Sequence, residues 1–216
     1  ERRQDCAMFH ANDIEKALLW GQTYSGTRNN FPFRTMNGLI NYVTQQAAGN
    51  ITTLGATTTW TQLEAAFDPV FQQVTDPKNP NERVLFVGGV ARRVIHAICR
   101  LNSQYMINDQ VTEWGLQFDT IKTPRGRFNL VEHPLFNAFG SSAAWSKMAI
   151  AIDLPTFSLD YMTGRKTQSR EFNMSGQPVD NGIDAVGGTL TTELTCLVKN
   201  AAANGIQYNY TAGAVG

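Results

Sequence analysis

Apolar residues recur at steps of three and four along the first part of the chain, a period typical of helices with one apolar face. Between residues 1 and 21 this stripe comprises Cys6, Phe9, Ile14 and Leu18, and Gly21 is suited to a left-handed cap at its end. The pattern therefore predicts a helix over residues 1–21. Because the helical period is already established at the first residue, which is not methionine, we expect further chain upstream.

Two shorter helices are predicted next. Thr35 is placed to cap a helix after a turn-rich connector over residues 21–33. The apolar face of this helix comprises Met36, Leu39, Ile40 and Val43. Thr59 and Gln62 have the spacing of a capping box, which predicts the start of another helix. Pro69 is expected to kink or split that helix because proline cannot donate a backbone hydrogen bond.

Strand patterns dominate the second half. The run "VLFVGG" (84–89) predicts a short buried strand that leads into a helix, and "MAIAIDL" (148–154) alternates as a strand does. Near the end, "TLTTELTCLV" (189–198) and "GIQYNYT" (205–211) also alternate and are predicted to pair with each other. The predicted helices come early in the chain and the predicted strands come late, with one strand-helix unit between them. This order favours an α+β fold over regular βαβ winding.

The stretch "TIKTPRGRFNLVEHPL" (120–135) predicts a β-hairpin, because turn residues lie between two extended arms. Pro124 at the second turn position and Gly126 at the fourth suit a type I turn followed by a glycine bulge. Arg125 and Arg127 lie at its tip. They can contact a phosphate or a carboxylate of a neighbouring subunit, or remain in solvent.

The composition of the chain argues against some classes of function. The 216 residues are 42% hydrophobic, enough for one large or two small domains, and 18 basic residues balance 18 acidic ones. A protein held to DNA mainly by phosphate contacts should carry a basic excess, so a dedicated DNA-binding domain is not expected. Low charge leaves surfaces that another protein can cover, a weak indication of assembly. Cys6, Cys99 and Cys196 lack metal-site spacing and are expected to be reduced thiols.

Candidate chemistry is sparse. The Gly88-Gly89 strand-to-helix turn can present backbone amides to a phosphate, but no nucleotide-binding motif surrounds it, so we interpret it as a tight turn. His133 follows Glu132 on a strand, where neighbours point to opposite faces, and a hydrogen-bonding role is expected. The remaining polar candidates lack motif spacing: His10, His96, Ser141-Ser142 and the group Asp180, Asn181, Gly182 and Asp184. No catalytic residue, cofactor or metal site is predicted.

Five segments, taken in order, resemble a known family. These are "DIEKALLWG", "RTMNGL", "VLFVGGVARRVIHAI", "TPRGRFNLVEHPLF" and "AIAIDLPTFSLDYMTGRKTQ". Their succession is similar to that of tailed-phage major capsid proteins with the Hong Kong 97-type fold. The resemblance covers nearly the whole chain and rests on the order of the segments, since no single motif is diagnostic.

The resemblance implies an α+β capsid fold with a long spine helix at residues 1–21. It implies a peripheral (P) domain part at 1–49, an axial (A) domain at 50–155 and a return to the peripheral sheet at 156–216. The N-terminal arm and extended loop that precede the spine helix in the family are not expected within this chain. The hairpin over 120–135 would be an axial-domain element with Arg125 and Arg127 as possible subunit contacts.

The implied function is a non-enzymatic subunit of a phage or prophage head in the virion, first assembled in the bacterial cytoplasm. Its partners would be other copies in hexamers and pentamers, with packaged double-stranded DNA nearby without sequence-specific binding. Scaffold, portal and decoration proteins are further possible partners, and no cofactor or membrane is expected. Two alternatives stay open: a nucleotide- or phosphate-binding enzyme using Gly88-Gly89, and the shell subunit of a bacterial protein compartment.

Overall fold

The fold was obtained as a computed structural model, which describes residues 2–55, 58–73, 81–101, 111–113, 116–138, 144–172 and 187–211. The chain forms two compact units. Unit 1 comprises Glu1–Leu39 and Ser158–Leu197, and unit 2 comprises Ile40–Phe157 and Val198–Gly216. Among the described residues, no helix is both long enough and apolar enough to cross a membrane.

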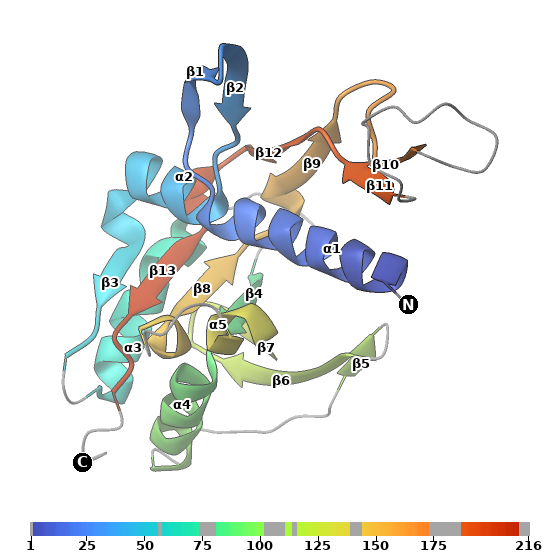
Figure 1. Ribbon diagram of the computed structural model, residues 1–216. Helices are drawn as coiled ribbons and strands as arrows, with labels where there is room; N and C mark the ends of the chain where they lie inside the picture. Colours follow the sequence, from blue (N-terminus) through green and yellow to red (C-terminus); the bar gives the residue numbers. More distant parts are fainter. Residues whose placement is uncertain are drawn as a thin grey trace. The chain divides into compact units, whose positions relative to one another are not determined.

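Unit 2 is built on a seven-stranded mixed sheet with the order β3-β13-β8-β4-β7-β6-β5 (Figure 1). Two neighbouring pairs, β4 with β7 and β13 with β3, are parallel, and the other neighbours are antiparallel. The strands are β3 (Ile51–Thr53), β4 (Glu82–Val87), β5 (Val111–Glu113), β6 (Leu116–Lys122), β7 (Arg127–Glu132), β8 (Ala149–Ile152) and β13 (Gly205–Tyr208). This mixed sheet with helices confirms the α+β class.

The helices of unit 2 are α3 (Trp60–Phe67), α4 (Gly89–Leu101) and α5 (Pro134–Ala138), and α2 (Leu39–Gln46) begins at the boundary between the units. Five 3-10 turns complete it: η1 (Ala48–Asn50), η2 (Asp68–Gln72), η3 (Trp145–Lys147), η4 (Leu154–Thr156) and η5 (Ala201–Ala203). The main core lies between α3, α4 and the sheet, where Phe128 packs with ring centroids 4.4 Å from Phe67 and 4.8 Å from Phe71.

Several local predictions for unit 2 are confirmed. Thr59 and Gln62 form the capping box of α3, and the helix gives way to η2 at Asp68, one residue before Pro69. The strand-helix unit is β4 followed by α4, and Val94 and Ile98 of this helix are buried. The "MAIAIDL" strand is β8, but all four of its residues are buried, since β8 lies between two other strands in the middle of the sheet.

The central hairpin is formed by β6 and β7, as predicted, but its glycine bulge is not present. Thr123 and Gly126 are paired in both directions: the amide of each donates to the carbonyl of the other, at 2.7 and 3.2 Å. Gly126 has no positive φ. A Cβ there would lie 2.5 Å from the Asn81 carbonyl oxygen and the Phe71 ring. Glycine is therefore needed at this position for close packing and not for an unusual backbone angle.

The predicted pairing of the last two strands is wrong. β12 (Leu194–Val198) pairs with β9 (Phe157–Tyr161), whereas β13 joins the large sheet between β3 and β8. Alternation shows that a segment is a strand with two different faces, but it does not identify the neighbouring strand. The partners of β13 lie more than 50 residues away in the sequence.

Unit 1 contains the long helix α1 (Arg2–Trp20), which confirms the first predicted helix, and three small two-stranded sheets. These are β1 (Tyr24–Arg28) with β2 (Phe31–Thr35), β10 (Gln168–Phe172) with β11 (Gly187–Thr191), and β9 with β12. The predicted stripe does not all face a core, because Cys6 and Phe9 are exposed. Periodicity identifies a helix but not whether anything covers its apolar face.

The predictions for residues 21–38 need correction. The expected connector forms the β1-β2 hairpin, whose turn residues Asn29 and Asn30 both have positive φ, 53° and 63°, as a type I′ turn requires. Thr35 ends β2 and does not cap α2; its hydroxyl donates to the Gln22 carbonyl at 2.5 Å. Gly21 is not left-handed either. It lies against Gly38, whose amide donates to the Gly21 carbonyl at 2.8 Å.

A buried ion pair ties the central strands of unit 2 together. Nη1 of Arg83, on β4, lies 3.5 Å from Oδ1 of Asp153, directly after β8, and both side chains are almost completely inaccessible. The guanidinium also donates to the carbonyls of Glu82 and Gln73, each at 2.8 Å, and lies over the Phe71 ring. These hydrogen bonds offset part of the cost of burying the charge.

We expect Arg83→Met to lower the free energy of unfolding by about 3–5 kcal/mol, because it leaves the Asp153 carboxylate buried without its cation. Urea denaturation of the purified chain measures the change. Arg125→Met is the matched control: its pair with Asp68, at 3.2 Å, is about half exposed, so the loss should stay below about 1 kcal/mol. Equal losses in the two variants would contradict this account.

Candidate functional site

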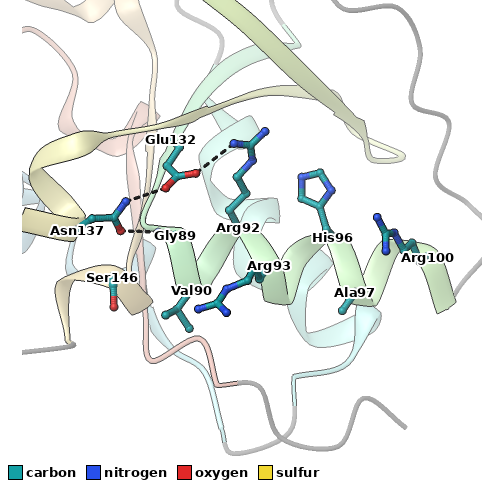
Figure 2. Close-up of a pocket in the computed structure, with 10 residues that line it drawn as sticks. All are labelled: Gly89, Val90, Arg92, Arg93, His96, Ala97, Arg100, Glu132, Asn137 and Ser146. Carbon is teal, nitrogen blue, oxygen red and sulfur yellow. Dashed lines mark hydrogen bonds and ion pairs between the residues drawn. The ribbon is translucent and has the colours of Figure 1, made fainter.

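Several residues considered as candidates in the sequence, among them Gly89, His96 and Glu132, lie around one cavity beside α4. A cavity of about 650 Å³ is lined by residues of α4 together with Glu132, Asn137 and Ser146 (Figure 2). The residues from α4 are Gly89, Val90, Arg92, Arg93, His96, Ala97 and Arg100. The strand-to-helix turn at Gly88-Gly89 opens into this cavity, which makes it the place to test for bound ligands.

The amino-terminal end of α4 is already occupied by a side chain. The Gly89 amide donates to Oδ1 of Asn137 at 2.8 Å, and Nδ2 of Asn137 donates to Oε1 of Glu132 at 2.7 Å (Figure 2). Gly88 is needed for close packing, because a Cβ there would collide with the backbone of Ser146. The two glycines therefore serve a tight turn under η3, as interpreted from the sequence, and Asn137 supplies the partner that a phosphate would otherwise provide.

An ionic network continues from Glu132 along α4. Nη1 of Arg92 donates to Glu132 at 3.1 Å, and Nη2 donates to Asp119 at 2.6 Å. The hydrogen bond to Asp119 is the main cause that raises the pKa of Arg92. Sequence reasoning missed this network because Asp119 and Glu132 lie on β6 and β7. The register of that hairpin is needed to bring them to one side of α4.

His96 lies on the same side of α4 as Arg92 (Figure 2). Its Nε2 is 3.3 Å from the Asp119 carboxylate. Burial is the largest influence on its pKa and lowers it, against the attraction of Asp119. Arg92 and Arg100 lower it further. His96 and Arg92 thus both lie against the Asp119 carboxylate, in a network that joins α4 to β6.

His133 has a structural role at the end of β7. It is buried, its ring lies between those of Phe86 and Phe136, and its Nδ1 accepts the Leu135 amide at 3.3 Å. This confirms the expected hydrogen-bonding role. His10, on α1, is hydrogen-bonded to the Thr192 hydroxyl at 2.7 Å. Neither histidine belongs to a cluster of possible metal ligands, and no such cluster occurs in the part of the chain that the structure describes.

The hairpin arginines are paired within their own chain. Nε of Arg125 lies 3.2 Å from Asp68, and Nη2 of Arg127 lies 2.6 Å from Glu82; both side chains remain about half exposed. The remaining sequence candidates, Ser141-Ser142 and the group from Asp180 to Asp184, lie outside the described residues.

None of the three cysteines is in a disulfide. Burial raises the pKa of the Cys99 thiol to about 12 and that of Cys196 to about 11, so both are protonated at neutral pH. A protonated thiol is a poor nucleophile and a poor metal ligand. Cys99 belongs to the core on α4, where it acts as a small apolar side chain.

The fold is similar to that of chains from an encapsulin complex and from a phage procapsid. It is similar to a subunit of the holo-SrpI encapsulin complex from Synechococcus elongatus PCC 7942, with a TM-score of 0.57 and 12% identity, over 97% of this chain and 64% of that one. It is also similar to a chain of the satellite phage P4 procapsid that includes the size determination (Sid) protein. That match has a TM-score of 0.51 and 13% identity, over 95% of this chain and 62% of that one.

Sequence comparison identifies the family. Residues 1–211 match the family model of the SU10 major capsid protein, and the chain therefore belongs to this family of phage major capsid proteins. It is 31% identical over 205 residues to the major capsid protein of Pseudomonas phage PaMx41, a match that covers 89% of this chain. The chain spans about half of that relative, 48% of its length. The resemblance to tailed-phage capsid proteins seen in the sequence is thereby confirmed.

We expect Gly88→Ala to lower the free energy of unfolding by about 1–3 kcal/mol, because the added methyl group would collide with the Ser146 backbone. Gly49→Ala is the control, since nothing lies within 4 Å of a Cβ at that position. Urea denaturation distinguishes the two. The packing role assigned to Gly88 is wrong if the Gly88→Ala variant is as stable as the unmodified chain. A variant of unchanged stability that binds a nucleotide more weakly than the unmodified chain would favour the nucleotide-binding role instead.

Proposed function

We propose that the chain is part of the subunit from which an icosahedral phage head is built, and that it self-assembles into hexameric and pentameric capsomers around double-stranded DNA. The family match over residues 1–211 carries this proposal. The fold shared with a procapsid chain and an encapsulin supports it. The role is structural and non-enzymatic, with the virion as the final location and the host cytoplasm as the place of assembly. Scaffold, portal and decoration proteins remain possible partners.

The physical character of unit 1 supports an assembling subunit. Its buried residues among those described are few: Leu19, Gly38, Leu39 and Cys196. Of the exposed large hydrophobic residues in the described chain, all but Leu154 belong to unit 1. A unit with so little core and so much exposed apolar surface gains stability when another molecule covers it. Unit 2, by contrast, has an extensive core of its own.

The domain assignment follows the same proposal. In the Hong Kong 97-type arrangement, residues 1–49 and 156–216 would form the peripheral (P) domain, with α1 as its spine helix, and residues 50–155 the axial (A) domain. The two compact units divide at 39/40, 157/158 and 197/198, and the second unit includes β13 with the large sheet. A chain that leaves the first unit and later returns to it supports the proposed twofold division.

The two alternative functions have less support. Asn137 occupies the helix start that a nucleotide-binding enzyme would need, and Gly88 is explained by packing. A bacterial compartment shell shares the fold, as the encapsulin match indicates, but a match at 12% identity concerns the fold alone. The family match favours the phage head protein over the compartment shell.

The direct test is to express the full-length protein, alone and with its scaffolding partner, and to examine the products by electron microscopy. We expect closed shells or capsomers, since identical copies with heterologous contacts form closed rings and shells. Persistent monomers in both expressions would overturn the proposed function, whereas protein-filled shells formed without any phage component would favour the compartment alternative.

We further propose Arg125 and Arg127 as subunit contacts. In the full-length protein, Arg125→Glu together with Arg127→Glu should reduce the yield of shells while changing the free energy of unfolding by no more than about 2 kcal/mol, since both ion pairs are about half exposed. Sedimentation measures assembly and urea denaturation measures stability. Lys122→Glu, also exposed and adjacent to this hairpin tip, is the control for a single charge reversal and is compared with Arg125→Glu and Arg127→Glu made one at a time. Unchanged shell yield would remove the two arginines from the interface.

A further inference from the structure

The β1-β2 hairpin has one aromatic face that nothing in the described chain covers. In its antiparallel register Tyr24 lies opposite Thr35, Gly26 opposite Phe33, and Arg28 opposite Phe31, and cross-strand partners share a face. This face, which we call the aromatic face, therefore comprises Tyr24, Arg28, Phe31 and Phe33. Tyr24 is 53% exposed, Phe31 73% and Phe33 36%. The other face carries Ser25, Thr27, Pro32 and Arg34.

The aromatic face is ordered within the hairpin although it is uncovered. The Tyr24 and Phe33 rings have centroids 6.1 Å apart, and the Arg28 guanidinium lies 5.7 Å from the centre of the Phe33 ring. The Tyr24 ring also lies over Gly26, where a Cβ would come within 2.5 Å of its hydroxyl. Rings and guanidinium thus form a preorganised surface. An isolated two-stranded hairpin is only marginally stable in water, so such a surface gains most when it is covered.

A second uncovered surface of unit 1 has complementary chemistry. Residues 3–9 and 11–13 of α1 are all exposed, including Met8 at 60% and Phe9 at 67%. Asp5 and Asp13 lie one turn before and one turn after Phe9, on the same side of the helix. Lys16 pairs with Asp13 at 3.3 Å. The hairpin, in contrast, carries two arginines and no acidic residue between residues 21 and 38.

The two surfaces do not cover each other within one chain, because both are exposed. Figure 1 shows the hairpin leaving the carboxyl end of α1, whereas Phe9 lies eleven residues before that end, about 16 Å along the helix. Both belong to the same chain and are present in every copy. They are therefore available for a heterologous contact, in which the hairpin of one copy meets the helix of the next.

We propose that the aromatic face of the β1-β2 hairpin binds the exposed amino-terminal half of α1, residues 3–13, in a second copy of this chain. Phe31 and Phe33 pack against Met8 and Phe9, and Arg28 lies near the Asp5 carboxylate. The inference rests on the proposed function, since it names one contact through which copies assemble.

The available area indicates how strong this contact is. Three aromatic side chains bury at most about 450–750 Å² between them, at about 150–250 Å² each. A stable pair of proteins usually buries about 800 Å² on each partner. The hairpin contact is therefore too small to hold an isolated dimer. It acts as one of several contacts per subunit in a shell, where simultaneous contacts reinforce one another.

Photocrosslinking in the full-length protein identifies the partner. A benzoylphenylalanine in place of Phe31 preserves an aromatic ring, and after irradiation of assembled material we expect a covalent dimer of two copies joined through a peptide within residues 3–13. The same probe in place of Leu154, which is 53% exposed but lies in unit 2, should not give that linkage. A linkage to any other protein, to another segment or within one copy would overturn the proposed contact.

Substitutions test the energetic role. Phe31→Ser together with Phe33→Ser should lower the yield of shells at least about tenfold, while Thr27→Ala, on the opposite face of the hairpin, and Leu154→Ser leave it unchanged. Melting temperatures of the dissociated subunits confirm that each variant is folded. If the unmodified protein assembles and the double variant assembles equally well, this contact is refuted and the capsid function stands. If the unmodified protein never assembles, the proposed function itself fails.

Discussion

The buried ion pair between Arg83 and Asp153 is the constraint on which the organisation of unit 2 depends. Arg83 lies on the central strand β4, and Asp153 directly follows β8, so the pair joins two adjacent strands that are 70 residues apart. The Asp153 amide donates to Asn204 at 2.9 Å, which brings in the turn before β13, and Arg83 reaches the Gln73 carbonyl. A charge that is fully buried admits few alternative arrangements of these segments, because any slip of one strand would separate it from its partner.

The two units differ in where their apolar side chains lie. In unit 2 the apolar side chains form an internal core between α3, α4 and the sheet. Gly88 and Gly126 allow neighbouring segments of this unit to approach the backbone closely. Unit 1 leaves Met8, Phe9 and Phe31 exposed. Burial of these side chains against another molecule would contribute favourable free energy that the isolated chain does not have. Unit 2 thus has an extensive core of its own, whereas unit 1 exposes much of its apolar surface.

Local sequence rules predicted the elements whose determinants are adjacent in the chain. The capping box of α3, the strand-helix unit of β4 and α4 and the β6-β7 hairpin all depend on residues within a few positions of one another. The misses have non-local or ambiguous causes. The Asn29-Asn30 turn was interpreted as part of a connector because asparagine is common in tight hairpin turns and in longer loops alike. The position of β13 in the sheet depends on strands that are far away in the sequence. The network at α4 needed the register that puts Asp119 and Glu132 beside Arg92.

The charge balance of the chain affects how copies would approach one another in the proposed shell. Arg92, Arg125 and Arg127 each pair with a carboxylate of their own chain. The formal net charge of these 216 residues is zero, so they add little long-range repulsion between copies in the proposed assembly. Recognition between copies would then depend on short-range packing of apolar and aromatic side chains. Contacts of that kind would be individually weak, so an incorrectly placed subunit could dissociate before a shell closed.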